Sequence, residues 1–236
     1  DYYFPCNNLA VKYNSINADA NMTVCNVGYE TGKFGQSAKI DSALKQKAYF
    51  PDTVSSLEDA STNFTLTFWC KLPADTKELA AIVTNKTDHY ALSSKGIALF
   101  AHKNGNKLQL QLTASDGSSN LSAYADIPTD TWVFITLSLD TASNTLFCHY
   151  SIDNNTLKNI SVDYTSLDSI ALTNSYWGFN GNNGDHYYNE HKDRECIIYY
   201  NDITVWNKKL TEAEMTNFLN TTIPAGGYST MLHYYP

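Results

Sequence analysis

Carboxylates that could hydrolyse a glycosidic bond are scarce in this sequence. Retaining hydrolysis needs two carboxyl groups about 5 Å apart, a spacing that alternate positions of one strand supply. Asp193 and Glu195 are the only pair at this spacing next to a strand-like segment, and Arg194 stands between them. A salt-bridge ladder on the surface explains such a trio better. The six histidines have no partner arrangement that the sequence can place. We therefore expect no catalytic residues.

Residue types suited to ligand binding gather between residues 174 and 195. The segment is long, polar and aromatic, and its glycines allow a shaped loop. Aromatic rings can contact the C–H faces of sugars, while amides and carboxylates bind their hydroxyl groups, and loops carry such sites on rigid scaffolds. The ligand-binding residues are expected at the tip of this loop: Asn182, Asp185, His186, Tyr187 and Tyr188.

The elements that must position this loop are strands, because the dominant period of the sequence is two. In residues 63–70, apolar residues alternate with Thr65, Thr67 and Trp69, which predicts a half-buried antiparallel strand. Asn104-Gly105 lies between two apolar runs and indicates a hairpin. Further strands are expected at residues 79–84, 96–101, 107–112, 132–139, 145–152, 160–164 and 197–206.

One helix is well specified near the end of the chain. Thr211 is a favourable N-cap, and Glu214 three residues later completes a capping box. Leu210 and Met215 have the spacing of a hydrophobic staple around that cap. Pro224 follows and is incompatible with a continuing helix.

The length of 236 residues is consistent with one large all-β domain. We see no repeat, linker or low-complexity stretch, so residues 1–236 are interpreted as a single domain. The pattern predicts a two-sheet antiparallel β-sandwich, or jelly roll, with one short C-terminal helix. The chain begins inside a strand-like segment at Asp1. We expect it to be excised from a longer protein whose neighbouring domains are partners.

The charge balance excludes some classes of partner. The net charge is −8 and no basic run occurs. Nucleic acid needs a positive footprint, so it is disfavoured, as is an acidic membrane surface. The longest apolar runs, such as residues 132–137, are only strand-length, which argues against membrane insertion.

The five cysteines, Cys6, Cys25, Cys70, Cys148 and Cys196, have no C-x-x-C spacing, so a zinc site is not expected. Cys70 continues the apolar phase of its strand and is expected to be a small buried hydrophobe. The odd number excludes a fully paired framework within the chain, and Cys6–Cys25 is the one disulfide kept open. Mostly free, buried thiols favour folding in a reducing compartment.

Four segments, in the correct order over almost the whole chain, resemble the laminin G-like domains of the concanavalin A-like lectin/glucanase superfamily. Residues 32–41 are similar to its GKFGQAL-x-F-D-G stretch, and residues 64–71 to its FTISFWVK strand. Residues 132–137 resemble its W-x-H-V-A-V strand, and residues 199–215 its YIDDVRIYNRALSAEEI segment. The resemblance implies a jelly-roll sandwich. It leaves the function open, because one fold hosts many functions.

The resemblance also bears on the candidate sites. Glucanases of this fold carry an E-x-D-x-E strand, and this sequence has none. Many members hold calcium at a rim, which makes Asp202, with Asn201 beside it, a candidate metal site. The alternative is that Asp202 is a buried carboxylate that hydrogen-bonds loop amides. Trp177 and Phe179 lie where the family has a strand, so one or both are expected in the core.

By elimination, the sequence favours a non-catalytic surface-recognition module that binds a glycan or a cell-surface receptor. We expect it in a phage or virion fibre or appendage. The alternative is a carbohydrate-binding or adhesion domain of a secreted bacterial or eukaryotic protein. The expected location is accordingly a virion surface or the extracellular space. A glycoside hydrolase and a purely structural spacer remain further alternatives. Calcium is the one cofactor considered.

Overall fold

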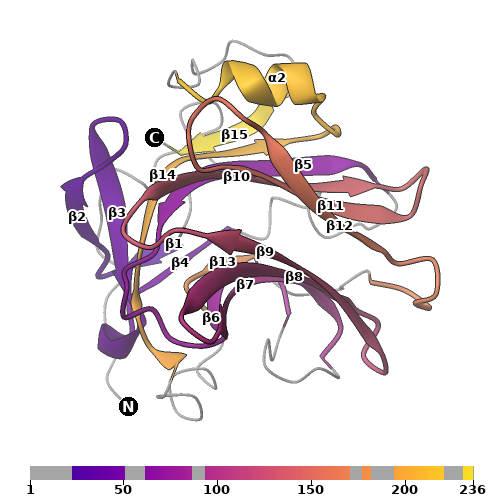
Figure 1. Ribbon diagram of the computed structural model, residues 1–236, viewed down its shortest axis with the longest axis horizontal. Coiled ribbons are helices and arrows are strands. Elements are labelled where there is room, and N and C mark those ends of the chain that lie inside the picture. The colour runs from indigo at the N-terminus through magenta and orange to yellow at the C-terminus, as the bar shows by residue number, and fades with distance from the viewer. Residues whose placement is uncertain are drawn as a thin grey trace.

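Two antiparallel sheets lie face to face in the computed structural model of the chain (Figure 1). The structure describes residues 23–50, 62–86, 94–170, 177–181, 194–220 and 231–235, the last range by its backbone only. The strands of the seven-stranded sheet are, in order, β1 (Thr23–Cys25), β4 (Lys47–Tyr49), β13 (Gly178–Phe179), β6 (Ala80–Thr84), β7 (Gly96–Asn104), β8 (Lys107–Ser115) and β9 (Asn120–Ile127). The predicted β-sandwich is confirmed.

The second sheet carries the only α-helix within the described residues. Its order is β12 (Lys158–Asp163), β11 (Thr145–Ser151), β10 (Trp132–Asp140), β5 (Phe64–Lys71), β14 (Ile197–Trp206), β3 (Gln36–Asp41) and β2 (Gly28–Thr31), and β15 (Met231–Tyr235) also pairs with β14. Helix α2 (Glu212–Asn217) lies on the outer side of this sheet, at the top of Figure 1. A short 3₁₀ helix, η3 (Ser42–Leu44), follows β3.

The inner core between the sheets is formed by the inward side chains of both. Phe68 of β5, Tyr200 of β14 and Phe179 of β13 meet there. The ring centroids of Phe68 and Phe179 are 5.8 Å apart, and those of Phe179 and Tyr200 are 5.2 Å apart. The Tyr200 hydroxyl donates a hydrogen bond of 2.6 Å to the Ile82 carbonyl of the facing sheet. This buried polar group is therefore satisfied, as stable cores require.

Three cysteine thiols belong to the protein's interior. Cys70, Cys148 and Cys196 are buried and free, as the sequence predicts for Cys70. Burial raises the pKa of Cys148 to about 12 and that of Cys196 to about 12, so both thiols stay protonated at neutral pH. Cys6 and the side chain of Cys25 lie outside the described residues, and their disulfide stays a prediction.

The outer face of the eight-stranded sheet is buried as well, which corrects the prediction of a half-buried strand at residues 63–70. Thr65, Thr67 and Trp69 alternate with the inward residues as predicted, but all three are inaccessible to solvent. The cause is an outer cluster that α2 and its flanks form over the sheet: Trp69, Phe134, Trp206, Leu210, Met215, Phe218 and Leu219. The rings of Trp206 and Phe218 stack with centroids 5.5 Å apart, and this contact packs the end of the helix against the sheet.

Strand β14 contains an irregularity that serves both faces. Its pairing with β5 shifts between Asn201 and Thr204, where one extra residue is inserted, and Asp202 adopts a positive φ of 50°. Because a bulge changes which residues face inward, Tyr200 before it and Ile203 after it both point into the inner core. Trp206 can then join the outer cluster.

Helix α2 begins as the sequence predicts. Thr211 is the N-cap, and its hydroxyl accepts a hydrogen bond from the Glu214 backbone N–H, while the Glu214 side chain accepts from the Thr211 N–H. Leu210 and Met215 are both buried in the outer cluster, in keeping with the staple. The capping box fixes where the chain leaves β14 and enters the helix.

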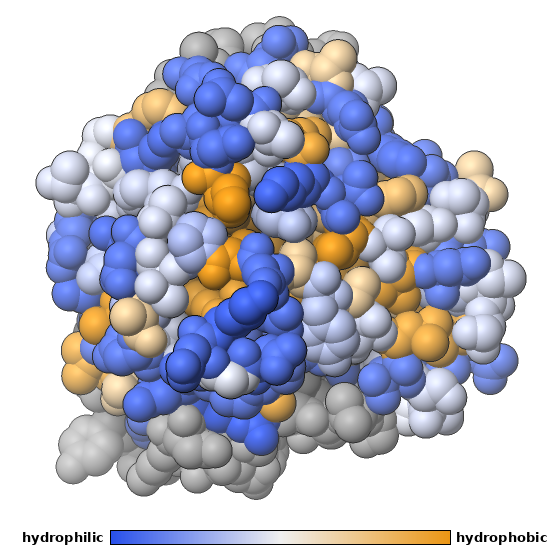
Figure 2. Space-filling view, viewed as in Figure 1, coloured by the Kyte–Doolittle hydropathy of each residue, from blue (hydrophilic) through white to orange (hydrophobic). Residues whose placement is uncertain are grey.

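Hydrophilic residues cover most of the face shown in Figure 2. On the face shown in Figure 2, hydrophobic side chains form small patches separated by hydrophilic ones, the grey residues aside. No helix within the described ranges is long and apolar enough to cross a membrane.

Candidate functional site

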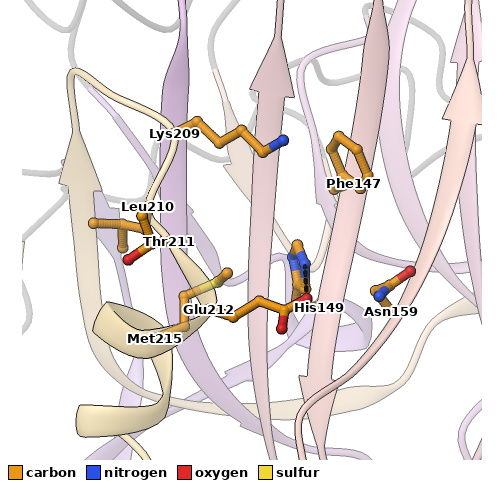
Figure 3. Close-up of a pocket in the computed structure, with 8 residues that line it drawn as sticks. All are labelled: Phe147, His149, Asn159, Lys209, Leu210, Thr211, Glu212 and Met215. Carbon is orange, nitrogen blue, oxygen red and sulfur yellow. Dashed lines mark ion pairs between the residues drawn. The ribbon is translucent and has the colours of Figure 1, made fainter. Parts of the chain in front are cut away.

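A cleft of about 430 Å³ opens on the outer face of the eight-stranded sheet, between β11 and β12 on one side and the β14–α2 connection on the other (Figure 3). We call it the α2 cleft. Its lining residues are Phe147, His149, Asn159, Lys209, Leu210, Thr211, Glu212 and Met215.

Strand register places the floor of the α2 cleft. Cys148 points into the inner core, so its neighbours Phe147 and His149 project from the outer face of β11. His149 pairs with Thr136 of β10 on one side and with Asn159 of β12 on the other. The rings of Phe147 and His149 stack with centroids 5.8 Å apart, forming a continuous aromatic strip.

The start of helix α2 forms the opposite wall of the cleft. Because Thr211 starts α2, Glu212 stands at its first turn and reaches toward His149, with Oε1 4.0 Å from Nε2. Lys209 lies just before the cap, and its Nζ is 2.8 Å from Asp140 Oδ2 and 4.1 Å from the centre of the Phe147 ring. The Lys209 ammonium lowers the pKa of Asp140 through this contact.

His149 is the unusual group in the cleft. Its residue is only 5% exposed, and burial lowers its pKa, with Lys209 adding to the effect and Glu212 opposing it. The ring is therefore neutral at neutral pH and has one donor and one acceptor nitrogen. The Nδ1 atom makes no hydrogen bond with any part of the chain that the structure describes. A buried polar atom of this kind is uncommon in a folded protein.

The remaining polar groups of the cleft face solvent. Asn159 and Glu212 are exposed, and no hydrogen bond engages the Asn159 amide within the described ranges. Glu212 is the only carboxylic residue among the described residues that line the cleft. A neutral imidazole, an amide and a carboxylate beside an aromatic strip can exchange hydrogen bonds with a hydroxylated ligand.

The loop residues predicted from the sequence, Asn182, Asp185, His186, Tyr187 and Tyr188, lie outside the described residues and stay predictions. The start of the same segment is described, and it belongs to the core. Trp177 and Phe179 are both buried in the inner core, which confirms the alternative taken from the resemblance. Asn180 is also buried, and its amide donates to the backbone carbonyls of Ile40 and Cys196 at 2.7 and 2.8 Å.

The predicted metal residues Asn201 and Asp202 lie together at the β14 bulge. The Phe34 backbone N–H donates to Asn201 Oδ1 at 2.7 Å, and Asn201 Nδ2 donates to the Gln36 carbonyl at 3.0 Å. The amide thus holds the β2–β3 turn, where Gly32 approaches so closely that an added Cβ would lie 2.8 Å from Asn201 Oδ1.

Asp202 is buried, with 4% of its surface exposed. No group of three or more His, Cys, Asp or Glu side chains that could hold a metal ion occurs in the described part of the chain. Calcium at Asn201 and Asp202 stays a prediction, since backbone and amide oxygens can also bind this ion.

Sequence reasoning missed the residues of the α2 cleft. The sequence places no partner beside any histidine, and it marks Glu212 only as the residue after the expected N-cap at Thr211. Strand position is the one signal in the sequence that could have indicated this site. His149 occupies the outward phase of a strand, and the next strand places Asn159 directly opposite. What the sequence does not show is that α2 folds back over this strand pair.

These observations define a two-sheet antiparallel jelly roll with a polar cleft on its outer face. The family model described as the concanavalin A-like lectin/glucanases superfamily matches residues 42–216. The chain belongs to this superfamily. No curated protein matches the sequence.

Several solved structures with the same fold are binding domains of toxins. The binding domain of Paraclostridial Mosquitocidal Protein 1 is similar with a TM-score of 0.64 and 15% identity, over 86% of this chain and 48% of that one. The binding domain of botulinum neurotoxin DC, in complex with rat synaptotagmin II, is similar with a TM-score of 0.59 and 13% identity, over 86% of this chain and 47% of that one. A structure of botulinum neurotoxin type C, a toxin whose cell entry depends on interaction with two ganglioside molecules, is similar with a TM-score of 0.58 and 12% identity. The match covers 87% of this chain and 47% of that one. The chain thus spans about half the length of these neighbours.

Proposed function

We propose that this chain is a non-catalytic recognition module that binds a saccharide unit in the α2 cleft. The observation that carries the proposal is the buried imidazole of His149, whose Nδ1 has no hydrogen bond within the described residues, beside the exposed groups of Asn159 and Glu212. Sugar hydroxyl groups both donate and accept, so they suit a neutral imidazole, an amide and a carboxylate together.

The size and character of the cleft support a small polar ligand. Its volume of about 430 Å³ lies within the usual range of ligand sites. The Phe147–His149 strip offers an apolar surface for the C–H face of a sugar ring, although Lys209 covers part of it. One saccharide residue with its substituents matches this combination.

Binding without hydrolysis is favoured by the charges in the cleft. Retaining hydrolysis needs two carboxyl groups about 5 Å apart. Glu212 is the single carboxylic residue among the described lining residues, and the neighbouring basic group, Lys209, is engaged with Asp140. The similar structures being binding domains supports the same choice.

The setting of the module belongs to the proposal too. We retain the phage or virion appendage and the secreted adhesion or carbohydrate-binding domain as alternatives, with a glycan or a cell-surface receptor as partner. The toxin neighbours favour an extracellular module within a longer protein. Loop residues Asn182, Asp185, His186, Tyr187 and Tyr188 remain a second candidate site, and calcium at Asp202 remains a candidate cofactor.

A glycan array tests the proposal. The wild-type chain is compared with Asn159→Ala and Glu212→Gln, and with Asn104→Ala, which removes an exposed amide from β7 of the other sheet. We expect both cleft variants to lose at least about tenfold in affinity for the saccharides that the wild type retains, because each loses one hydrogen bond to the ligand. Asn104→Ala should bind as the wild type does. Absence of saccharide binding, or unchanged binding in both cleft variants, would overturn the proposal.

A further inference from the structure

Aromatic and lysine side chains alternate across four strands on the outer face of the eight-stranded sheet. The cross-strand register places Lys71 of β5 opposite Trp132 of β10 and opposite Tyr199 of β14, and Tyr199 opposite Lys39 of β3. These four side chains share the face of Trp69, which lies two positions before Lys71. We call them the aromatic–lysine row.

The rings hold the ammonium groups against the sheet. Lys71 Nζ lies 4.3 Å from the centre of the Tyr199 ring and 5.5 Å from that of Trp132. Beside the row, Lys33 Nζ lies 4.5 Å from the centre of the Trp69 ring. Each contact has the geometry of a cation–π interaction, which restrains a lysine that would otherwise move freely in solvent. Two positive groups are therefore preorganised on one surface.

Only one of the three lysines on this surface forms an ion pair among the described residues. Lys39 forms an ion pair of 2.6 Å with Glu30. Lys33 and Lys71 have no ion-pair partner among the described residues. Carboxylates also lie nearby, since Glu30 interacts with Lys71 and Tyr199 and Asp130 interacts with Tyr199, but neither forms an ion pair with Lys33 or Lys71. An ammonium group with no ion-pair partner can still bind an anionic group of a ligand.

We propose that the aromatic–lysine row, together with Lys33, binds an acidic saccharide. Its carboxylate or sulfate group would lie between Lys33 and Lys71, and its ring would contact the half-buried Trp132 and Tyr199. Charged hydrogen bonds to ammonium groups and a flat aromatic surface are the two elements such a ligand requires.

A saccharide suits this surface better than a membrane. Trp132, Tyr199 and Phe34 are half-buried against the sheet, and neither of the exposed large hydrophobic residues, Leu44 and Tyr124, belongs to the row. Insertion into a lipid interface requires apolar side chains that project. Rings lying flat beside fixed charges are instead suited to contacting a sugar ring.

The row is separate from the α2 cleft. Both lie on the same face of the sheet, but Trp132 precedes Thr136, the β10 residue opposite His149, by four positions. The outer cluster around Trp69 and Phe134 occupies the positions between them. Binding of an acidic saccharide at the row is therefore independent of binding of a saccharide unit in the α2 cleft.

Binding of sialyllactose and of a heparin-derived hexasaccharide, measured by calorimetry with lactose as the neutral match, tests this proposal. We expect the wild type to bind at least one acidic saccharide more tightly than lactose, and more weakly as salt is raised. Lys33→Gln and Lys71→Gln should each weaken that binding about tenfold, and Lys71→Arg should restore most of it. Urea midpoints of the variants establish that they are folded.

Two control variants separate this site from the cleft. Lys103→Gln removes an exposed charge from β7 of the other sheet and should leave acidic-saccharide binding unchanged. Asn159→Ala in the α2 cleft should also leave it unchanged. Failure to bind either acidic saccharide, equal loss in Lys103→Gln, or binding only to phosphatidylserine vesicles would overturn the proposal.

Discussion

The two faces of the eight-stranded sheet are buried in different ways. The inner face packs against a second sheet, and its aromatic groups, such as Phe68 and Tyr200, contact residues from both layers. The outer face is covered by a six-residue helix and its flanks. Hydroxyl side chains line the outer face, as where Thr67 and Thr204 hydrogen-bond at 2.5 Å.

This difference explains where binding groups can lie. A sheet packed on a sheet leaves no room for exposed polar side chains between the layers. A single short helix covers only the middle of the outer face, so polar residues are exposed on both sides of it. The α2 cleft lies on one side and the aromatic–lysine row lies on the other.

We expect the largest loss of stability from a substitution on the inner face of the sheet. Phe68→Ala should lower the free energy of unfolding by about 3–5 kcal/mol, since the ring is fully buried between the layers. Phe218→Ala in the outer cluster should cost less globally and mainly release α2. Urea denaturation and amide hydrogen exchange measure the two effects. Equal exchange rates in α2 for both variants would contradict the distinction.

A smaller loss of stability is expected from a substitution in the β2–β3 turn, which Asn201 holds by hydrogen bonds. Gly32→Ala places a Cβ 2.8 Å from Asn201 Oδ1 and 2.9 Å from the Ser37 backbone nitrogen, which should destabilise the fold by about 1–3 kcal/mol. Gly28→Ala is the matched control, because its Cβ would meet ordinary contacts from 3.6 Å. Urea midpoints should fall for Gly32→Ala only, and a fall of the same size in both would refute the packing argument.

His149 should make the outer face sensitive to acid. Its pKa is lowered in the folded state, so below the unfolded value near 6.5 the unfolded chain binds more protons than the native one. Above that pH, His149 has no effect on the free energy of unfolding. As the pH falls below it, the free energy of unfolding decreases by at most about 1.4 kcal/mol per pH unit. Unfolding of wild type and His149→Gln at pH 7.5 and 5.5 tests this. The wild type should lose more stability, and identical losses would exclude the effect.

The smallest effect concerns the helix cap. Thr211→Ala removes the hydroxyl that accepts from the Glu214 N–H and should cost about 1 kcal/mol. Thr216→Ala, on the exposed side of the same helix, should be neutral or slightly stabilising, because alanine is the better helix former. Thermal midpoints distinguish the two. A larger loss at Thr216 would show that the cap is not what fixes α2.

Local pattern predicted most of the fold. Alternation gave the inward phase of β5 and β10, and the bounds of β14 and the cap at Thr211 were as expected. Burial of Trp69 on the outward phase was missed, because alternation says which face a residue takes and not what covers that face. The bulge at Asn201–Asp202 was missed for a related reason, since one inserted residue reverses the alternation halfway along a strand.

The candidate sites were less predictable than the fold. His149 and Asn159 face each other on consecutive strands, but Glu212 is distant in the sequence and meets His149 only because the chain returns over β11. The aromatic–lysine row likewise depends on four strands from distant segments. The ligand-binding residues predicted from the sequence all fall within one polar segment, residues 174–195, because composition can reveal only residues that are close together in the chain.

Recognition of saccharides without their cleavage is tested most directly by a glycan array probed with the chain at high density, in calcium and in EDTA, followed by assay of the bound saccharides for new reducing ends. We predict that the wild type retains saccharides and releases no reducing ends, and that Asn159→Ala and Lys71→Gln lose different ones. Release of reducing ends, or no retained saccharide in either condition, would contradict the account.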